Sequence, residues 1–264
     1  MSLDFTIPAE HPALAGHFPG QPIVPGALLL EQLSNVLAQH IGQPLYSAKQ
    51  LRFTAPLAPT QKVDVEYTEK TAGDYRFTAH ANNQLIAKGV LSSTISTNLA
   101  PSIELSIAPG GAAIATKAAS LYDKLPHQGD ICLLDSIISY DTESIYCLSK
   151  QAASCPLRHN TGLPAWASLE YAAQALACHG MLNARDNGEP DTITSAWVIG
   201  VKHLHCQQQY LPQADNEAYT IAARILAHQP GIASYEFSLA NNNTYLAFGR
   251  LNVAFDTSPA LKKA

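Results

Sequence analysis

The sequence has few charged residues. Asp, Glu, Lys and Arg make up only 14% of its 264 residues, whereas hydrophobic residues make up 47%. This balance argues against a disordered chain and favours a well-packed globular protein of one large or two small domains. The formal net charge is −5. The chain therefore lacks the basic excess of nucleic-acid-binding proteins, and we expect no nucleic-acid partner.

Metal-binding and redox motifs are also missing. The five cysteines all lie in the second half, their number is odd, and no two have C-x-x-C spacing. We therefore predict reduced thiols and a cytoplasmic protein. His179, His203 and His205 are scattered over helix and strand patterns, and no three histidines and carboxylates make a metal set. We expect no metal and no cofactor.

Neither a targeting segment nor a membrane span is expected. The N-terminus has no basic region followed by an apolar core, so it does not resemble a signal peptide. Residues 163–182 form a long apolar run, but the run contains Glu170, Gln174 and His179. These polar residues favour a buried helix of a soluble protein over a membrane span.

The first half reads as one helix followed by an antiparallel sheet. From Gly26 to Ile41 apolar residues recur at intervals of three and four, with Pro25 before and Gly42 after as start and stop signals. Segments with alternating or β-rich patterns between turn residues predict strands. The strands expected in this half are 3–7, 46–54, 62–70, 75–81 and 85–97.

A segment rich in Pro, Gly and Ala separates the two halves. Its composition predicts a linker over residues 98–118, with one short strand near 103–107. The second half then repeats the plan, with an apolar helix from Pro164 to Asn183. The strands expected here are 132–135, 144–150, 193–205, 218–227, 234–240 and 245–255.

The two halves look like an internal duplication. Pro25–Glu31 and Pro164–Glu170 match without gaps, with the second segment 139 residues after the first. A long helix wrapped by an antiparallel sheet is the hotdog plan, and such units normally pair edge to edge. We predict an α+β double hotdog, an internal pseudo-dimer with units at 1–97 and 119–264. The sequence leaves further homo-oligomerisation open.

The loop and helix at the start of the chain carry candidate chemistry. A neutral imidazole such as His17 can abstract a proton next to a thioester carbonyl. A buried carboxyl such as Glu31, with its pKa raised by an apolar helix, can protonate a departing hydroxyl. The Gly26 N–H at the helix N-terminus can bind the carbonyl oxygen as it gains negative charge. This set suits loss of water from a 3-hydroxyacyl thioester. A turn histidine and a structural glutamate are the alternative interpretations.

The motif G-H-F-P-G-x-P-x-x-P-G over residues 16–26, followed by Glu31, resembles the 3-hydroxyacyl-[acyl-carrier-protein] dehydratases of fatty-acid synthesis. The segments Leu125–His127, Leu133–Asp135 and 163–174 resemble one subunit of the heterodimeric dehydratases of aryl polyene pathways, and the first half resembles the other subunit. The resemblance implies a fusion of the two subunits. It also implies that the histidine of one hotdog works with the acidic residue of its partner's helix.

The second half departs from the family pattern. Pro156 stands at the position equivalent to His17, and Ala165 stands at the position equivalent to Gly26. His159 is nearby, but it aligns with His17 only if three residues are deleted. The second unit therefore lacks a well-aligned loop histidine while it keeps the helix acid.

This departure predicts one complete site. We assign His17 as the base, Glu170 as the acid supplied by the other unit, and Gly26 as the carbonyl-binding amide. Glu31 is assigned to a second site that lacks a good base, and the sequence leaves its activity open. His127 is interpreted as structural.

The resemblance also implies the partner, an acyl carrier protein bearing a 3-hydroxyacyl-phosphopantetheine. Because carrier proteins are acidic, we expect a basic lip at the entrance of the site. The candidates for this lip are Lys49, Arg52, Arg158 and Lys202. Two other functions stay open. A hotdog thioesterase would release free acid, and a non-catalytic acyl-thioester binding module would hold His17 and Glu170 too far apart for catalysis.

Overall fold

A computed structural model describes residues 3–17, 20, 22–95, 101, 103, 112–125, 127–150, 155–189, 195–212 and 218–256. In the first unit a short 3-10 helix and a long helix α1 are accompanied by five strands. These elements are β1 (Leu3–Thr6), η1 (Pro12–Leu14), α1 (Gly26–Ile41), β2 (Ser47–Phe53), β3 (Lys62–Thr71), β4 (Asp74–Ala81) and β5 (Gln84–Ser92). The elements expected in this half are confirmed to within a few residues, except that the strand predicted over 85–97 already ends at Ser92, and residues 96–97 lie outside the described residues.

Helix α1 has the predicted bounds. Pro25 precedes it with an extended backbone, and Gly42 ends it in the left-handed conformation at φ 74°, with its N–H bonded to the Ala38 carbonyl at 2.9 Å. Leu28, Leu30 and most other apolar residues of α1 are buried in the core of the protein. The helix is therefore the core of its unit, and its N-terminus lies directly after the motif that holds His17.

The second unit contains the longer helix α3 and the longer strands. Its elements are β6 (Ala112–Lys117), α2 (Ala119–Tyr122), η2 (Gly129–Ile131), β7 (Ser136–Tyr140), β8 (Ser144–Lys150), β9 (Leu163–Pro164), η3 (Ala165–Ala167), α3 (Ser168–Asp186), β10 (Ser195–Cys206), β11 (Tyr210–Leu211), β12 (Ala218–Gln229), β13 (Ile232–Asn241) and β14 (Thr244–Asp256). The helix begins with a short 3-10 turn, so its regular part starts later than predicted.

The strand predicted at 132–135 is wrong. Side chains from elsewhere take up the two central backbone N–H groups of this segment: Leu133 donates to Gln174 Oε1 at 2.9 Å, and Leu134 donates to the Tyr122 hydroxyl at 2.8 Å. A backbone bonded to side chains cannot also pair as a strand. The strand in this region is β7, which starts at Ser136.

Strand β6 lies inside the segment expected to be a linker. It pairs antiparallel with β7, with Ala112 opposite Tyr140. Of the short strand predicted near 103–107, all but Ile103 lies outside the described residues. Among the described residues, no helix is long and apolar enough to cross a membrane.

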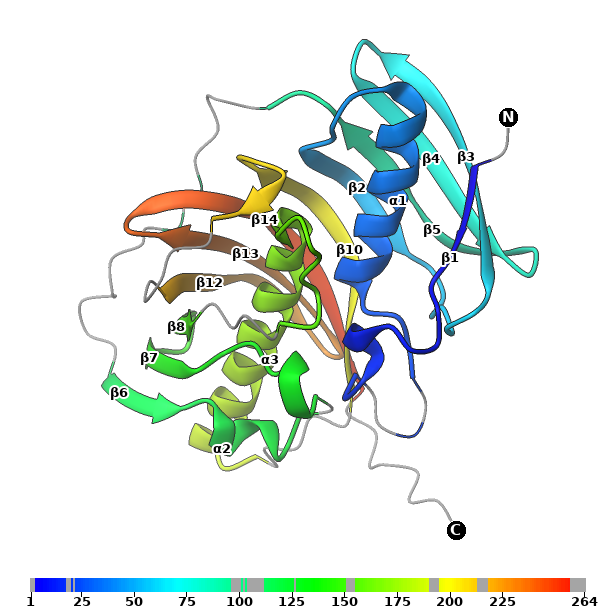
Figure 1. Ribbon diagram of the computed structural model, residues 1–264. Helices are drawn as coiled ribbons and strands as arrows, with labels where there is room; N and C mark the ends of the chain where they lie inside the picture. Colours follow the sequence, from blue (N-terminus) through cyan, green and yellow to red (C-terminus); the bar gives the residue numbers. More distant parts are fainter. Residues whose placement is uncertain are drawn as a thin grey trace.

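One antiparallel sheet of twelve strands unites the two units, in the order β1-β3-β4-β5-β2-β10-β14-β13-β12-β8-β7-β6. Strands β2 and β10 pair across the junction, with Leu51 opposite Val201. Figure 1 shows α1 against the strands of the first unit and α3 against those of the second. The strand order runs outward from the junction in matching sequence on both sides, which confirms the predicted α+β double hotdog.

Candidate active site

A hydrogen bond within the described part of the loop fixes the tautomer of the His17 imidazole. His17 is only 7% exposed, and its Nδ1 lies 2.7 Å from the carbonyl oxygen of Ile23. A carbonyl can only accept a hydrogen bond, so Nδ1 carries the proton and donates it. Nε2 is then left with its lone pair. Burial lowers the pKa of His17 below 6.5, although the charge of Glu170 acts in the opposite direction. The ring is therefore a neutral base near pH 7.

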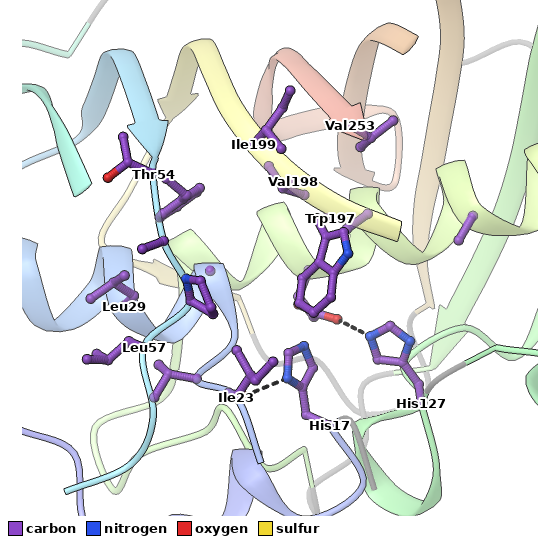
Figure 2. A pocket seen from close by; sticks show the side chains of 18 residues that line it. His17, Ile23, Leu29, Thr54, Leu57, His127, Trp197, Val198, Ile199 and Val253 are labelled. Atoms are coloured by element: carbon purple, nitrogen blue, oxygen red, sulfur yellow. Dashed lines mark hydrogen bonds and ion pairs between the residues drawn. The ribbon is translucent and has the colours of Figure 1, made fainter. Parts of the chain in front are cut away.

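An apolar cavity of about 300 Å³ adjoins His17. Its wall includes Gly26, the first residue of α1, whose N–H is one of the four amides that have no partner within the helix. Figure 2 shows the His17 and His127 imidazoles on one side of the cavity and apolar side chains such as Leu29 and Ile199 on the other. The cavity can hold an acyl chain with its thioester end next to Gly26.

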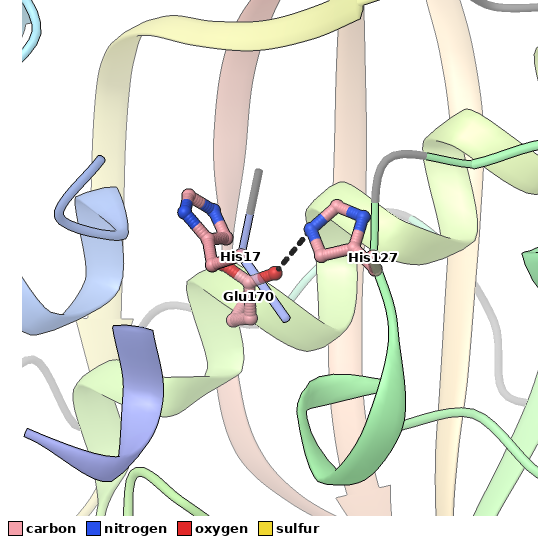
Figure 3. A group of neighbouring side chains, drawn as sticks. All are labelled: His17, His127 and Glu170. Carbon is pink, nitrogen blue, oxygen red and sulfur yellow. Dashed lines mark ion pairs between the residues drawn. The ribbon is translucent and has the colours of Figure 1, made fainter. Parts of the chain in front are cut away.

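Glu170 reaches this cavity from the first turn of α3, in the other unit. Glu170 is 5% exposed, and its Oε1 lies 3.1 Å from Nε2 of His127. One donor atom each from His17, His127 and Glu170 lies within 4.8 Å of the other two (Figure 3). The predicted partners His17 and Glu170 thus meet across the pseudo-dimer, at a separation that one hydroxyl group can bridge.

The pKa of Glu170 differs from the expectation. Burial acts to raise it, but the hydrogen bond and charge of His127, the charge of His17 and a hydrogen bond from Gln174 together lower it to about 2. The expectation that an apolar helix raises the pKa of this carboxyl is therefore wrong for Glu170. The group is an ionised carboxylate at neutral pH, and any proton it delivers must first come from a neighbour.

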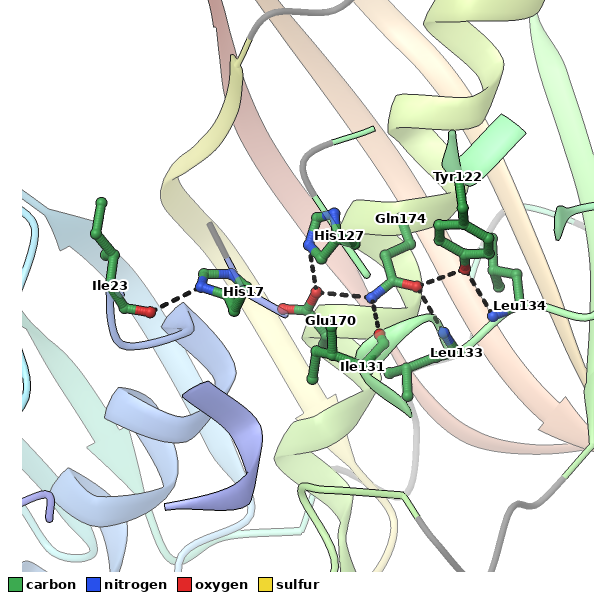
Figure 4. Close-up of polar contacts among 9 residues, drawn as sticks. All are labelled: His17, Ile23, Tyr122, His127, Ile131, Leu133, Leu134, Glu170 and Gln174. Carbon is green, nitrogen blue, oxygen red and sulfur yellow. Dashed lines mark hydrogen bonds and ion pairs between the residues drawn. The ribbon is translucent and has the colours of Figure 1, made fainter. Parts of the chain in front are cut away.

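A buried network holds Glu170 in place (Figure 4). Gln174 is fully buried one helical turn later, and its Nε2 donates to Glu170 Oε1 at 2.9 Å and to the Ile131 carbonyl at 2.8 Å. The Gln174 Oε1 accepts from the Tyr122 hydroxyl at 2.7 Å and from Leu133 N–H at 2.9 Å. Because every polar atom of Gln174 has a partner, the carboxylate has one preferred orientation.

His127 belongs to the site, which corrects its interpretation as structural. The loops of the two units pair here: His17 and His127 form an antiparallel bridge, and Gln128 N–H donates to the Gly16 carbonyl at 3.0 Å. Gly16 has φ of 80°, and a Cβ on it would lie 1.8 Å from the Gln128 carbonyl oxygen. This close approach explains the glycine before His17. The Leu-Pro-His segment is the sequence feature that marks His127, but no local pattern shows that this histidine faces the other unit.

The three donor atoms also form a set that the sequence did not predict. Two imidazoles and one carboxylate converge here, although no three such residues formed a set by spacing in the sequence. His17, His127 and Glu170 are far apart in the chain, and only the pairing of the two units brings them together.

A second His–Glu pair lies at the pseudo-equivalent position. His159 Nε2 is 2.5 Å from Glu31 Oε1, so the prediction that Glu31 lacks a base is wrong. A tight turn closed by two backbone hydrogen bonds between His159 and Gly162 positions the ring. Unlike His17 and Glu170, these two side chains touch, and no hydroxyl fits between them. The hydrogen bond that His159 donates to Glu31 raises the pKa of His159, and burial acts against it.

The family is decided by comparison with known sequences. The model of the ApeP-like dehydratase family matches residues 119–262, more than half of the chain. The chain belongs to this dehydratase family. The ApeI-like dehydratase model matches residues 1–90, so this ApeP-like dehydratase carries an ApeI-like unit in front. The resemblance to a fusion of two dehydratase subunits is confirmed.

One curated relative agrees with this assignment, and two solved structures share the fold. A 3-hydroxyacyl-[acyl-carrier-protein] dehydratase FabZ from Hydrogenobaculum sp. (strain Y04AAS1) is 30% identical over 100 residues, which span 32% of this chain and 68% of the relative. A trans-AT PKS dehydratase domain from Brevibacillus brevis superimposes with a TM-score of 0.75 at 14% identity, covering 96% of this chain and 92% of that one. A putative thioesterase from Novosphingobium aromaticivorans DSM 12444 has a TM-score of 0.59 at 16% identity, with coverages of 96% and 94%. The fold alone therefore does not separate dehydratases from thioesterases.

Proposed function

We propose that this ApeP-like dehydratase removes water from 3-hydroxyacyl groups on an acyl carrier protein, giving trans-2-enoyl thioesters in fatty-acid or aryl polyene biosynthesis. Membership of the dehydratase family supports the proposal. The observation that carries it is the meeting of His17 and Glu170, from different units, at an apolar cavity that begins at a helix N-terminus. Their separation also argues against a module that only binds acyl thioesters.

The reaction begins at His17. Its Nε2 lone pair takes the proton from C2 of the substrate, next to the thioester carbonyl. The carbonyl oxygen gains negative charge as this proton leaves, and the Gly26 N–H stabilises that charge at the N-terminus of α1. The backbone group is fixed before the substrate arrives, so no reorganisation is needed at this step.

Glu170 and His127 act on the hydroxyl group. The ionised Glu170 carboxylate accepts a hydrogen bond from the substrate hydroxyl on C3. When the C3–O bond breaks, the oxygen takes a proton that His127 supplies through Glu170, and it leaves as water. The proton on His17 then returns to His127 through the same carboxylate. The net change is loss of one water and formation of the C2–C3 double bond.

The partner proposed from the resemblance is an acyl carrier protein, and a basic groove of about 930 Å³ supports it. Among the described residues that line this groove, four are basic and none is acidic: Arg52, Arg76, Lys88 and Lys202. Ile199 lines both the groove and the cavity, so the two are adjacent. Two of the four residues expected at a basic lip are here; Lys49 instead pairs with Asp74 at 3.2 Å.

Two further assignments follow the same proposal. Because β6 pairs with β7, we place the start of the second unit at residue 112 rather than 119 and shorten the linker accordingly.

The five cysteines are all free, which supports a reducing compartment and hence a cytoplasmic location.

Mass spectrometry of 3-hydroxyacyl carrier proteins incubated with the protein tests the function. Dehydration predicts that the acyl carrier protein loses the mass of one water and keeps its acyl group. A thioesterase would instead release free acid and leave the carrier with a free thiol. Varying chain length and aryl content in the same experiment identifies the preferred acyl group. Hydrolysis as the main outcome, or no change with any substrate, would reject the proposed reaction.

A further inference from the structure

The donor atoms of His17, His127 and Glu170 form a cluster with a second chemical use. They come from the motif loop, the segment before η2 and the first turn of α3, and Figure 3 shows Glu170 together with the two rings. All three side chains are buried, and all three line the cavity. We propose that this cluster binds a divalent transition-metal ion such as Zn²⁺, and that the ion and the acyl substrate exclude each other.

The donor set is one that zinc uses. Two imidazole nitrogens and one carboxylate oxygen form three-ligand zinc sites that keep a fourth position open. In such sites the second ring N–H of a histidine is usually bonded to a carbonyl or carboxylate, which fixes the ring. His17 already has this arrangement through Ile23, at 2.7 Å, and Gln174 orients the Glu170 carboxylate at 2.9 Å. Two of the three ligands, His17 and Glu170, therefore already have the outer partners of a metal site.

The distances allow the ion to enter with small movements. With metal–ligand bonds of about 2.0–2.1 Å in a tetrahedron, neighbouring donor atoms lie about 3.3 Å apart. His127 Nε2 and Glu170 Oε1 are 3.1 Å apart and already match. No donor pair in the cluster is separated by more than 4.8 Å. Turning the His17 ring toward the other two closes the remaining gap, and the fourth position faces the cavity.

Metal and substrate compete because they need the same atoms. An ion bound to His17 Nε2 takes the lone pair that would abstract the C2 proton. It also occupies the space between His127 Nε2 and Glu170 Oε1, which are 3.1 Å apart and which the proposed reaction uses at the substrate hydroxyl. The carboxylate offsets one of the two positive charges brought into the cavity, and a water or hydroxide can fill the open position.

The test uses the full chain without an affinity tag, after removal of metals with a chelator. Titration with Co²⁺ is followed by its visible d–d absorption, and titration with Zn²⁺ is followed by calorimetry. We expect one ion per chain in the wild type, and binding at least about tenfold weaker in His127→Gln and in Glu170→Gln. His159→Gln is the matched control, because it alters the pseudo-equivalent pair and should bind the ion as the wild type does.

The result that overturns the site is no saturable binding, or equal affinity in the wild type and in correctly folded His127→Gln. If both variants misfold by circular dichroism, the Co²⁺ absorption of the wild type decides: the spectrum of a four-coordinate ion supports the site, and that of a six-coordinate ion overturns it. Exclusion of substrate predicts that Zn²⁺ inhibits dehydration competitively and that a chelator reverses it; stimulation or non-competitive inhibition contradicts it. Binding is measured without substrate, so failure of the metal site and failure of the proposed dehydration are distinguishable.

Discussion

At the scale of single residues, His17 should set the acid limit of activity. Its pKa is lowered by burial from the usual 6.5, and a base works only in its neutral form. The protein should therefore keep its activity as the pH falls below 6.5 and lose it only as the pH passes through the lowered pKa. The measurement is kcat/KM against pH, which reports the free enzyme. An acid limb above 6.5 would contradict the assignment of a buried neutral base.

The acids can be separated by substitution. Glu170→Gln should abolish dehydration. Glu31→Gln should leave much of the activity, because the Glu31 carboxylate contacts His159 directly and no substrate hydroxyl fits between them. His127→Gln should lower kcat by about 10²–10⁴-fold with little change in KM, since His127 supplies a proton and does not hold the acyl chain. Steady-state kinetics on one acyl carrier substrate checks all three variants. Equal losses in Glu170→Gln and Glu31→Gln would reject the cross-unit site.

The sequence predicts a site residue where the pattern that marks it lies within one short segment of the chain. The motif around His17 and the repeated helix placed His17, Gly26 and Glu170 correctly at one cavity. The ionisation of Glu170 could not be predicted, because it depends on His127, which precedes it by more than forty residues and meets it only through the folded second unit. An apolar helix pattern alone suggested a pKa shift of the opposite sign.

At the scale of elements, the contact between His159 and Glu31 joins the turn before α3 to helix α1. The folded pKa of His159 is raised above 6.5, so the pair contributes its full stability below the unfolded pKa and loses it as the pH rises through the folded value. His11 shares this environment, since the charges of His159 and Glu31 both act on it, although burial is the main cause that lowers its pKa.

The prediction is that Glu31→Gln is less stable than the wild type at about pH 6, and that the difference shrinks by about pH 8.5. Urea unfolding midpoints at the two pH values measure it. His159→Gln is the matched control. Its stability difference from the wild type should also shrink between the two pH values, because either substitution removes the ion pair. If the difference in urea midpoint between the variant and the wild type grows with pH, the ion pair does not stabilise the junction.

The helices and strands could be predicted where one pattern of apolar residues extends over enough positions. Helix α1 and strands β2 to β5 follow from periodicity and turn residues. The strand predicted at 132–135 did not form, because Leu133 and Leu134 donate their N–H groups to the Gln174 and Tyr122 side chains. Likewise, the alignment could not place His159, since its turn is shorter than the His17 loop and only the packing against α1 reveals its partner.

At the scale of the whole molecule, the charge is unevenly distributed. The chain has a net charge of −5, yet four basic side chains gather in the groove where the sheets of the two units join. Strands β2 and β10 supply Arg52 and Lys202 from opposite sides of the junction. The duplication therefore builds one shared sheet face and concentrates positive charge on it, next to the cavity at Ile199. A negatively charged carrier protein would be attracted to this face as it delivers its substrate.

Charge reversal tests this face. Lys202→Glu should weaken binding of the acyl carrier protein, chiefly by slowing association, and raising the salt concentration should reduce the difference from the wild type. Lys62→Glu is the matched control: Lys62 is exposed on β3, outside the groove, and pairs with Asp64 at 2.9 Å. Surface plasmon resonance at two salt concentrations gives both rates. Equal weakening by the two reversals would indicate a general charge effect, and a salt-independent loss in Lys202→Glu would point to damage to the β2–β10 junction instead of carrier-protein attraction.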